Sequence, residues 1–236
     1  GEARAKAPFA EPSVWTDRML TALEKGVKGG QWFSLIDKVY KPRNLEAAFE
    51  KVAKNRGSAG VDHQTIAMFT DRLERNLEWI SKALAEDRYE PQGVRRVWIP
   101  KPGKKGQQRP LGIPTVRDRV VQTALRNVME PIFEKDFAEH SYGFRPGRGC
   151  KDALRRVDAL LKQGYTWVVD ADLKSYFDLI PHDQLMGRVG EKISDSRVLS
   201  LIESYLNQDV MESMRSWVPE AGTPQGAVIS PLLSNI

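Results

Sequence analysis

A run of apolar residues that ends in two carboxylates, from Trp167 to Asp172, is the segment of this sequence best suited to metal-dependent chemistry. Residues two apart on a strand share a face, so Asp170 and Asp172 would project together if the strand includes both. Carboxylate oxygens suit Mg²⁺, which commonly binds one or two of them together with substrate phosphates. Two such ions, roughly 3.5–4 Å apart, would activate an attacking hydroxyl and stabilise a leaving oxygen. For an isolated Asp-x-Asp, the alternative that the aspartate caps the following helix stays open.

Two further segments combine turn-forming residues with groups that bind phosphates or bases. In residues 222–231, GTPQGAVISP, two glycines flank a proline and an amide, so the backbone can closely approach a ligand before a helix opens. In residues 94–113, two short β-prone runs, 94–99 and 110–113, flank a basic tip. This pattern predicts a hairpin that carries Lys101 as a point charge and Arg109 as a bidentate group. Taken alone, each segment is also compatible with an ordinary loop.

Positive charge is concentrated in one part of the chain. The net charge is +5, and the stretch from Arg95 to Arg119 holds eight basic residues against one acid, Asp118. Such a concentration suits a polyphosphate partner, although an isolated basic loop is more often simply solvated. Residues 140–148, HSYGFRPGR, interleave aromatic rings with arginines, which suits base stacking and phosphate pairing, or a packed turn. The residues predicted to contact nucleic acid are Arg95, Arg96, Lys104, Lys105, Arg117, Arg145 and Arg148.

Hydrophobic periodicity predicts the elements that must position these segments. The length of 236 residues suits one large domain or two small ones. A helix from 44 is expected to begin with Asn44 as its N-cap, and Pro131 is expected to bend a later helix. The predicted helices span residues 14–27, 44–54, 66–84, 117–137, 152–163 and 195–206, and the predicted strands span 94–99, 110–113, 165–173 and 211–218.

The composition excludes several classes of protein. Hydrophobic residues make up 41% and charged residues 28%, a mixture with enough apolar material for a core. The single Cys150 excludes a disulfide framework and a cysteine-based zinc site, which favours a reducing cytoplasm. No apolar run approaches the roughly 18 residues of a membrane span, so no membrane partner is expected. The tryptophans are expected to pack in the core or in loops.

Taken in chain order, these segments resemble the reverse transcriptases encoded by bacterial group II introns. The resemblance is carried by IPK at 99–101, RPLGIP at 109–114, HSYGFRP at 140–146, DLKSYFD at 172–178 and GTPQG at 222–226. The loop GSAGVD at 57–62 resembles that family's N-terminal extension of the fingers. The likeness covers roughly residues 10–236, and five motifs in register make chance a poor explanation.

The resemblance implies an α+β protein of right-hand polymerase architecture, with helical fingers, a basic β-hairpin and an incomplete palm sheet. Residues 1–43 would form an N-terminal extension, 44–164 the fingers and 165–236 part of the palm. The implied activity is RNA-directed DNA polymerisation, dependent on two Mg²⁺ ions, with a maturase role in intron splicing. The implied partners are intron RNA, an RNA template, a DNA primer and dNTPs.

Carried over by position, the resemblance also assigns roles to single residues. Asp172 would be the catalytic carboxylate that binds metal, helped by the Leu173 carbonyl oxygen. Phe177 would lie under the incoming sugar and exclude a 2′-hydroxyl. The remaining substrate contacts would be Lys101 and Arg109 on the triphosphate, and Gln225 and Gly226 at the nascent base pair.

The sequence departs from the family pattern in places. Ala227 replaces the second glycine that usually follows Pro-Gln, and no Asp-Asp pair occurs anywhere in the chain. We therefore expect a truncated palm that is inactive alone, with apolar surface around Val228, Ile229, Leu232 and Leu233 available for self-association. The alternative is a non-catalytic RNA-binding splicing cofactor; a nuclease that uses Asp172 is a more distant one.

Overall fold

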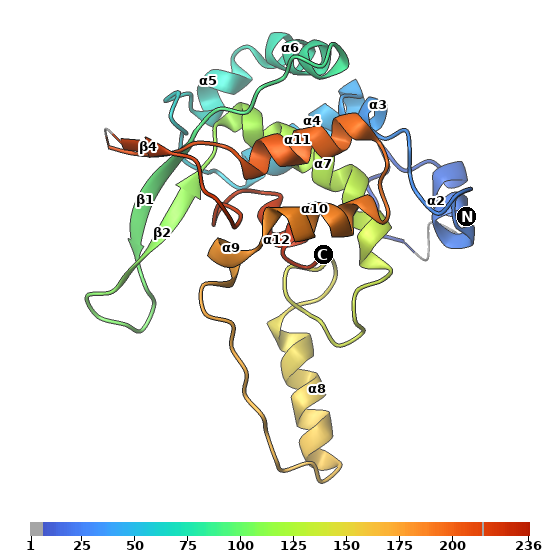
Figure 1. The fold of residues 1–236 in the computed structure, drawn as a ribbon, viewed down its shortest axis with the longest axis vertical. Helices are drawn as coiled ribbons and strands as arrows, with labels where there is room; N and C mark the ends of the chain where they lie inside the picture. Colours follow the sequence, from blue (N-terminus) through green and yellow to red (C-terminus); the bar gives the residue numbers. More distant parts are fainter. Residues whose placement is uncertain (1–6, 214) are drawn as a thin grey trace.

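The computed structural model describes residues 7–213 and 215–236 as an α+β arrangement in which one small sheet lies at the edge of a cluster of helices (Figure 1). The described helices are α2 (Asp17–Lys25), α3 (Ile36–Val39), α4 (Pro42–Lys54), α5 (Ile66–Thr70), α6 (Leu73–Ala85), α7 (Val116–Glu134), α8 (Cys150–Lys162), α9 (Tyr176–Leu179), α10 (His182–Gly190), α11 (Ser196–Leu206) and α12 (Ser230–Leu233). The described strands are β1 (Val94–Pro100), β2 (Gln108–Ile113), β3 (Val210–Glu212) and β4 (Arg215–Trp217). Residues 1–6 of the predicted N-terminal extension lie outside the described part of the chain.

The sheet has the strand order β2-β1-β3-β4. The predicted hairpin is confirmed, because β1 and β2 pair antiparallel in a register that runs from Arg95 opposite Ile113 to Pro100 opposite Gln108. β3 lies parallel to β1, and β4 returns antiparallel to β3. The prediction of a single strand over 211–218 is therefore wrong, because this part of the chain forms two short strands, β3 and β4. This second hairpin widens the sheet on the side away from β2.

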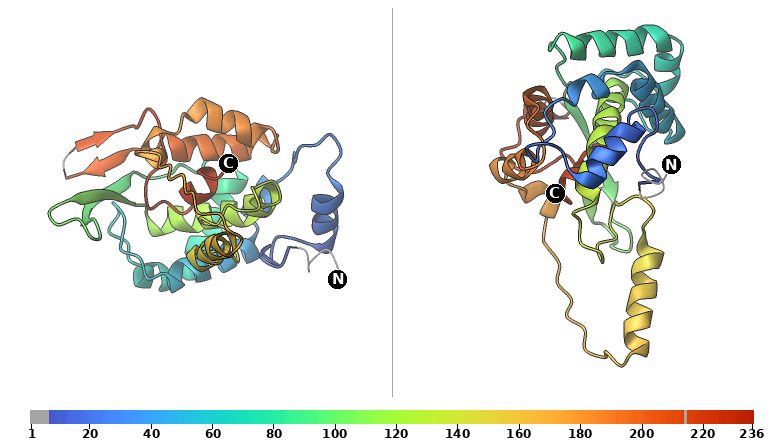
Figure 2. Two further views of the ribbon diagram at one scale, coloured as in Figure 1. Left: turned by 90° about the horizontal axis from the view of Figure 1, so that it is seen from below. Right: turned by 90° about the vertical axis from the view of Figure 1, so that its right-hand side faces the viewer.

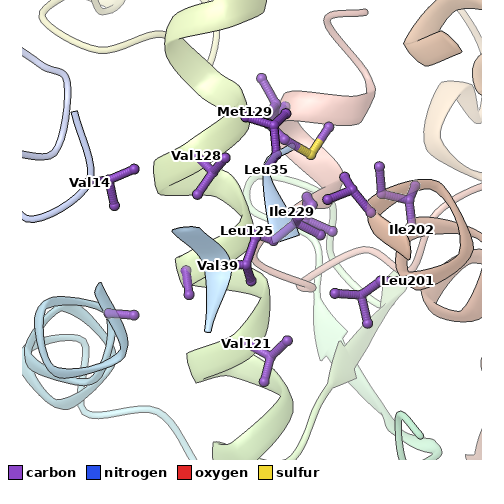
Figure 3. Close-up of a cluster of buried hydrophobic side chains, with 14 of the residues drawn as sticks. Val14, Leu35, Val39, Val121, Leu125, Val128, Met129, Leu201, Ile202 and Ile229 are labelled. Atoms are coloured by element: carbon purple, nitrogen blue, oxygen red, sulfur yellow. The ribbon is translucent and has the colours of Figure 1, made fainter. Parts of the chain in front are cut away.

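Helix α7 forms the centre of the core (Figure 3). Its apolar side chains are buried on more than one side, with α4 against one face and α11 and the residues before α12 against another. Pro131 lies inside the helix, as predicted. The side chain of Thr115 accepts a hydrogen bond from the Asp118 amide at 3.1 Å and so caps the first turn.

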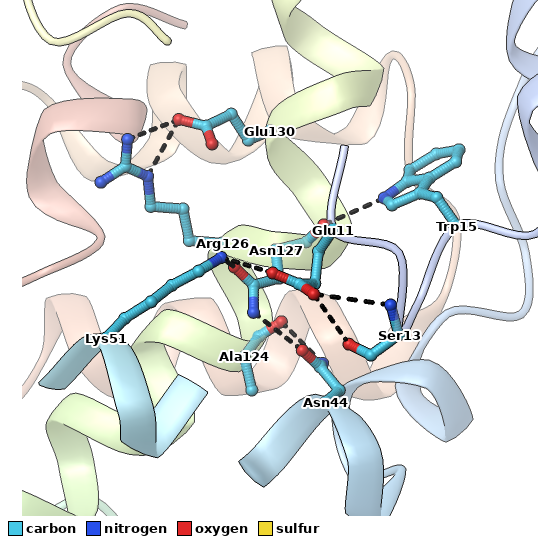
Figure 4. Close-up of polar contacts among 9 residues, drawn as sticks. All are labelled: Glu11, Ser13, Trp15, Asn44, Lys51, Ala124, Arg126, Asn127 and Glu130. Carbon is cyan, nitrogen blue, oxygen red and sulfur yellow. Dashed lines mark hydrogen bonds and ion pairs between the residues drawn. The ribbon is translucent and has the colours of Figure 1, made fainter. Parts of the chain in front are cut away.

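Buried polar contacts join the N-terminal segment and α4 to α7 (Figure 4). The prediction that Asn44 is the N-cap of its helix is wrong, because Pro42 already opens α4. Instead, the buried Asn44 amide donates to the Ala124 carbonyl oxygen at 3.1 Å and accepts from Asn127 at 2.9 Å. The Trp15 indole donates to the Asn127 carbonyl oxygen at 2.9 Å. These bonds satisfy polar groups that burial would otherwise leave unpaired.

The helix predicted over 66–84 is divided into α5 and α6 by a turn at Asp71 and Arg72. The turn lets Phe69 pack in the core, where its ring stacks on Phe49 at a centroid distance of 5.4 Å. The Asn76 side chain then donates to the Phe69 carbonyl oxygen at 2.9 Å. Side-chain packing therefore overrides a periodicity that one straight helix would also satisfy.

The prediction of a strand over 165–173 is wrong. Helix α8 and the segment after it project from the body of the protein, and the segment is extended without forming a strand (Figures 1 and 2). Trp167 is 98% exposed and Val169 is 93% exposed. A strand needs a neighbour that satisfies its backbone groups, and in the described part of the chain no strand lies beside this segment.

The prediction of exposed apolar surface around α12 is also wrong. Ile229, Leu232 and Leu233 are buried in the core beside α7. Exposed apolar side chains gather instead on the projecting α8 and on the segment after it. No helix in the described residues is long and apolar enough to cross a membrane.

A buried carboxyl group joins the entry of the hairpin to α7 and α11. Asp118 accepts hydrogen bonds from the Tyr89 hydroxyl at 2.8 Å, the Thr115 hydroxyl at 2.6 Å and the Gln92 amide at 3.3 Å. The Tyr205 hydroxyl of α11 lies 3.5 Å away. Burial raises the pKa of Asp118 from 3.8 to about 6, although the bonds from Thr115 and Tyr89 oppose that rise.

We predict that Asp118→Asn gains stability relative to the wild type as the pH rises. Between about pH 4 and pH 6 the native state keeps a proton that the unfolded state has lost, so wild-type stability falls across this window. Across this pH window, the unfolding free energy of the variant minus that of the wild type should rise by about 2–3 kcal/mol. Urea unfolding of both proteins at pH values on each side of the window measures it. Parallel pH profiles for the two proteins would contradict the prediction.

Candidate active site

The hairpin strand β2 packs directly against the loop 222–226 through backbone atoms. The Gly112 amide donates to the Gln225 carbonyl oxygen at 2.6 Å. A Cβ at Gly226, whose φ is +106°, would collide with the Gly112 carbonyl oxygen and lie 2.7 Å from Leu111 Cδ1. A Cβ at Gly112 would lie 2.7 Å from Val94 Cγ1. Glycine is required at position 226 because the backbone of β2 approaches so closely, and the Val94 side chain leaves little room for a Cβ at position 112.

The same loop holds the segment that follows Asp172. The Thr223 amide donates to the Phe177 carbonyl oxygen at 2.7 Å, and the Gly222 amide donates to the Ile180 carbonyl oxygen at 2.8 Å. A Cβ at Gly222 would lie 2.6 Å from the Phe177 carbonyl oxygen. The His182 ring nitrogen Nε2 lies 2.7 Å from the Gly222 carbonyl oxygen. The predicted 172–178 and 222–226 segments are thus neighbours in space.

Aromatic and amide contacts bring the fourth predicted segment to the same place. The Phe144 ring meets the Phe177 ring edge-on, with centroids 6.2 Å apart. The Asn235 side chain donates to the Gly143 carbonyl oxygen at 3.0 Å. The Tyr176 hydroxyl donates to the Ser234 carbonyl oxygen at 2.8 Å. Four segments that the sequence singled out therefore meet around residues 176–180 and 222–226.

A buried glutamine that the sequence analysis missed also positions this loop. The Gln122 side-chain oxygen on α7 accepts from the Val228 amide at 2.8 Å and from the Ile229 amide at 3.4 Å. Its side-chain nitrogen is buried without a hydrogen-bond partner among the described residues. The sequence feature that could have identified Gln122 is its place beside the apolar positions Val121 and Leu125, in a helix that is buried on most sides.

The basic residues of the hairpin tip are exposed. Lys101, Lys104, Lys105 and Arg109 lie on or next to the turn between β1 and β2 and make no ion pair with the described residues. The structure brings their hairpin to the loop 222–226, but it does not bring Lys101 or Arg109 into contact with Phe177 or Gln225 within the described chain. Their assignment to the triphosphate stays a prediction.

Other predicted nucleic-acid contacts have partners within the protein. Arg95 donates to the Ala59 carbonyl oxygen at 2.6 Å, and Arg117 lies over the Trp79 ring at 4.1 Å. Arg148 donates to the Glu139 carbonyl oxygen and is exposed. The bond from Arg95 secures the loop 57–62 against the hairpin, so this residue has a structural role as well.

Arg145 requires a correction. It is only 6% exposed, and its guanidinium makes an ion pair with the buried Glu134 at 2.7 Å. The same group donates to the carbonyl oxygens of Ala138 and Ser141. Because its donors serve the protein itself, Arg145 holds the turn 138–145 and is not available to a nucleic acid.

Asp172 lies in the projecting extended segment, and both it and Leu173 are exposed. No group of three or more potential metal-ligating side chains occurs among residues 7–213 and 215–236. Within the loop region, the Gln225 side-chain nitrogen lies 3.5 Å from both carboxylate oxygens of Asp178. The described residues therefore do not complete a metal site by themselves.

Residues 99–236, more than half of the chain, match the family described as reverse transcriptase (RNA-dependent DNA polymerase). The chain belongs to the reverse transcriptase family. The match includes the end of β1, all of β2, the loop 222–226 and the segment around Phe177, which the structure brings together.

Curated relatives agree with this family. Protein YkfC of Escherichia coli (strain K12) is 40% identical over 208 residues, which cover 86% of this chain and 54% of YkfC. The group II intron-encoded protein LtrA of Lactococcus lactis subsp. cremoris is 36% identical over 198 residues, which cover 83% of this chain and 32% of LtrA. This reverse transcriptase chain thus spans about half the length of one relative and about a third of the other.

A solved structure shares the fold. The chain described as a partial Cas6-RT-Cas1--Cas2 complex aligns with a TM-score of 0.56 and 24% identity, covering 86% of this chain and 33% of that chain. At this identity the likeness concerns the fold alone. It extends over most of the reverse transcriptase chain, including helices before residue 99 that the family match does not reach.

The contact between β2 and the loop predicts a position-specific effect of adding one methyl group. Gly226→Ala should lower the unfolding free energy by about 1–3 kcal/mol more than Gly103→Ala does, because its Cβ meets backbone atoms. Gly103 also has positive φ, but nothing lies within 4 Å of a Cβ there, so it controls for backbone strain. Urea unfolding measures both variants, and equal reductions would show that the close approach does not matter.

Proposed function

We propose that the full-length protein is an RNA-directed DNA polymerase of the group II intron type, with a maturase role in splicing. Residues 44–164 would form the fingers, 165–236 part of the palm, and 1–43 an N-terminal extension. The observation that carries this proposal is the meeting of the hairpin, the aromatic turn and the loop 222–226, together with the family match over residues 99–236. Names such as nuclear intron maturase 1 of Arabidopsis thaliana, 33% identical over 113 residues, support the splicing role.

In this proposal the chain contributes mainly by positioning substrates. A primer 3′-hydroxyl attacks the α-phosphate of a dNTP on an RNA template, and pyrophosphate leaves. Lys101 and Arg109 would neutralise the triphosphate, and Phe177 would exclude a 2′-hydroxyl from the sugar site. Mg²⁺ is the expected cofactor, and Asp172 with the Leu173 carbonyl oxygen would supply part of its ligand set.

The backbone geometry supports a substrate site at the loop 222–226. Gly226 is exposed beside β2, and Gln225 projects beside Asp178. Gln225 and Gly226 would then line the nascent base pair. Phe177 is held against Phe144 and its carbonyl oxygen is fixed by Thr223, so its ring has a defined place to meet a sugar.

Replacement of Asp172 tests the catalytic proposal in the full-length protein. Asp172→Ala should reduce Mg²⁺-dependent extension of a DNA primer on an RNA template by about 100-fold or more, because a preorganised charge at the reacting centre is removed. Asp17→Ala removes the same charge from the first turn of α2, outside the proposed site, and is the control. Unchanged extension by the Asp172 variant, or an equal reduction in both variants, would contradict the assignment of Asp172.

A second candidate function, RNA binding without catalysis as a splicing cofactor, is favoured by the exposed basic tip of the hairpin. Lys101, Lys104, Lys105 and Arg109 are exposed and free of ion pairs within the described residues. Intron RNA would be recognised through its shape and phosphates. This function can coexist with polymerisation in one protein.

The hairpin lysines should account for part of the salt dependence of RNA binding by this chain. In Lys104→Gln/Lys105→Gln, the slope of log K against log salt for a structured RNA should become shallower by roughly 0.7–0.9 for each phosphate that the variant no longer neutralises. Lys25→Gln/Lys28→Gln makes the same charge change at and beyond the end of α2, on the opposite side of the protein (Figures 1 and 2). Equal slopes for the two double variants would contradict binding of RNA at the hairpin.

A further inference from the structure

One face of the sheet carries two tryptophans that contact the same arginine. The Arg96 guanidinium carbon lies 4.9 Å from the centre of the Trp98 ring and 5.3 Å from the centre of the Trp217 ring. Both distances are within the range of a cation–π contact. The Trp98 indole also donates to the Glu212 carboxylate on β3. Trp98 remains 47% exposed, so this ring is available to a flat ligand.

A cleft of about 390 Å³ separates this face of the sheet from the loop 219–225. Its volume lies within the range of ligand-binding pockets. Apolar and planar groups make up much of its lining, namely Val94, Pro110, Val210, Trp217, Pro219 and Pro224. The lining therefore suits a flat ring rather than a hydrated ion.

The same cleft also offers polar groups to a ligand. Thr223 is only 4% exposed, and its hydroxyl has no hydrogen-bond partner among the described residues. Because a buried unpaired hydroxyl costs free energy, it is the group that a ligand would satisfy. The Gln225 amide, the Asp178 carboxylate and the Arg96 guanidinium complete a mixture of donors and acceptors that suits the edge of a nucleobase.

The cleft lies on the face of the hairpin opposite to Arg109. Side chains alternate along a strand, so Arg96 and Trp98 share one face of β1 while Ile99 lies on the other. In the register of the hairpin, Arg109 pairs with Ile99 and Pro110 pairs with Trp98. Pro110 lines the cleft and Arg109 does not. The cleft is therefore separate from the site proposed for the triphosphate.

We propose that this cleft binds an unpaired nucleobase of single-stranded RNA, stacked on Trp217, with the exposed Trp98 beside the cleft, and held at its edge by Thr223. The Asp178 carboxylate lines the cleft and disfavours a phosphate inside it, so the base enters and the phosphates stay outside, towards the basic hairpin. The proposal rests on the proposed function only in taking RNA as the partner. The base comes from the overhang of a template or from a loop of a folded RNA.

Binding of short RNA to this chain tests the proposal without dNTPs or a primer. The probes are a fluorescent oligoadenylate of about eight nucleotides and an abasic oligomer with the same number of phosphates. The wild type should bind the oligoadenylate about tenfold more tightly, and Trp98→Ala/Trp217→Ala should abolish this preference while leaving the abasic affinity unchanged. Trp79→Ala removes an indole that is also paired with an arginine, outside the cleft, and should keep the preference.

Thr223→Val gives a second measurement because it removes the hydroxyl and keeps the side-chain shape. Its oligoadenylate affinity should fall about threefold to tenfold, with an unfolding midpoint close to that of the wild type. The absence of a base preference in the wild type, or its survival in the tryptophan double variant, would overturn the proposal. The binding assay does not depend on primer extension, so the two proposals can fail separately. A full-length protein that extends a primer but shows no base preference would refute only the binding of a base in the cleft. A protein that shows the base preference but extends no primer would refute only the polymerase proposal.

Competition distinguishes the two sources of the base. A primer–template with an unpaired 5′ overhang should displace the oligoadenylate, whereas the same duplex with blunt ends should not, if the template supplies the base. An RNA hairpin with an unpaired loop should compete instead, if a folded RNA supplies it. Competition by neither RNA would contradict the proposal.

Discussion

The burial of α7 is the constraint on which the rest of the structure depends. A helix that is buried on most sides must find a partner for each polar side chain it carries. Asp118 is bonded from the entry of the hairpin, Gln122 holds the residues before α12, and Asn127 is bonded to Asn44 on α4. Because these residues are four and five positions apart on one rigid helix, α7 sets the spacing between the hairpin, the loop 222–230 and the N-terminal helices.

Between the hairpin and the loop, the contact is made by backbone atoms. Gly112 and Gly226 pack together with no space for a side chain, and Gly222 does the same against Phe177. A backbone hydrogen bond at such a short range tolerates little displacement, so the sheet and the loop form one surface. This explains why two segments more than a hundred residues apart each place glycine at the contact, with proline nearby to restrict the turn.

The sequence predicted local elements well and long-range partners poorly. The hairpin, α7 with Pro131, α8 and α11 were all found from spacing and turn chemistry. Asn44 and Arg145 were misassigned because each has chemistry that suits a surface or a cap, and only the fold shows that both are buried and bonded within the protein. The break at Asp71 followed from the packing of Phe69, which periodicity does not encode. The family motifs found the neighbours of the loop, but they include neither Gln122 nor the contacts of Trp98 and Trp217 with Arg96.

The surfaces proposed to bind nucleic acid and the segment proposed to bind metal differ in how firmly the described chain holds them. The hairpin, the loop 222–226 and the second hairpin are fixed by hydrogen bonds and by the core, so the surfaces proposed to meet a nucleic acid are already formed. Asp172 lies instead between the exposed Trp167 and the first turn of α9, in a segment whose apolar side chains are exposed to water. Catalysis requires reacting groups to be held in place to within a fraction of an ångström, and an unpaired extended segment does not supply that precision. The metal site proposed at Asp172 would therefore require a partner surface over Trp167 and Val169, whereas the RNA binding proposed for the hairpin would depend on contacts that this chain makes within itself.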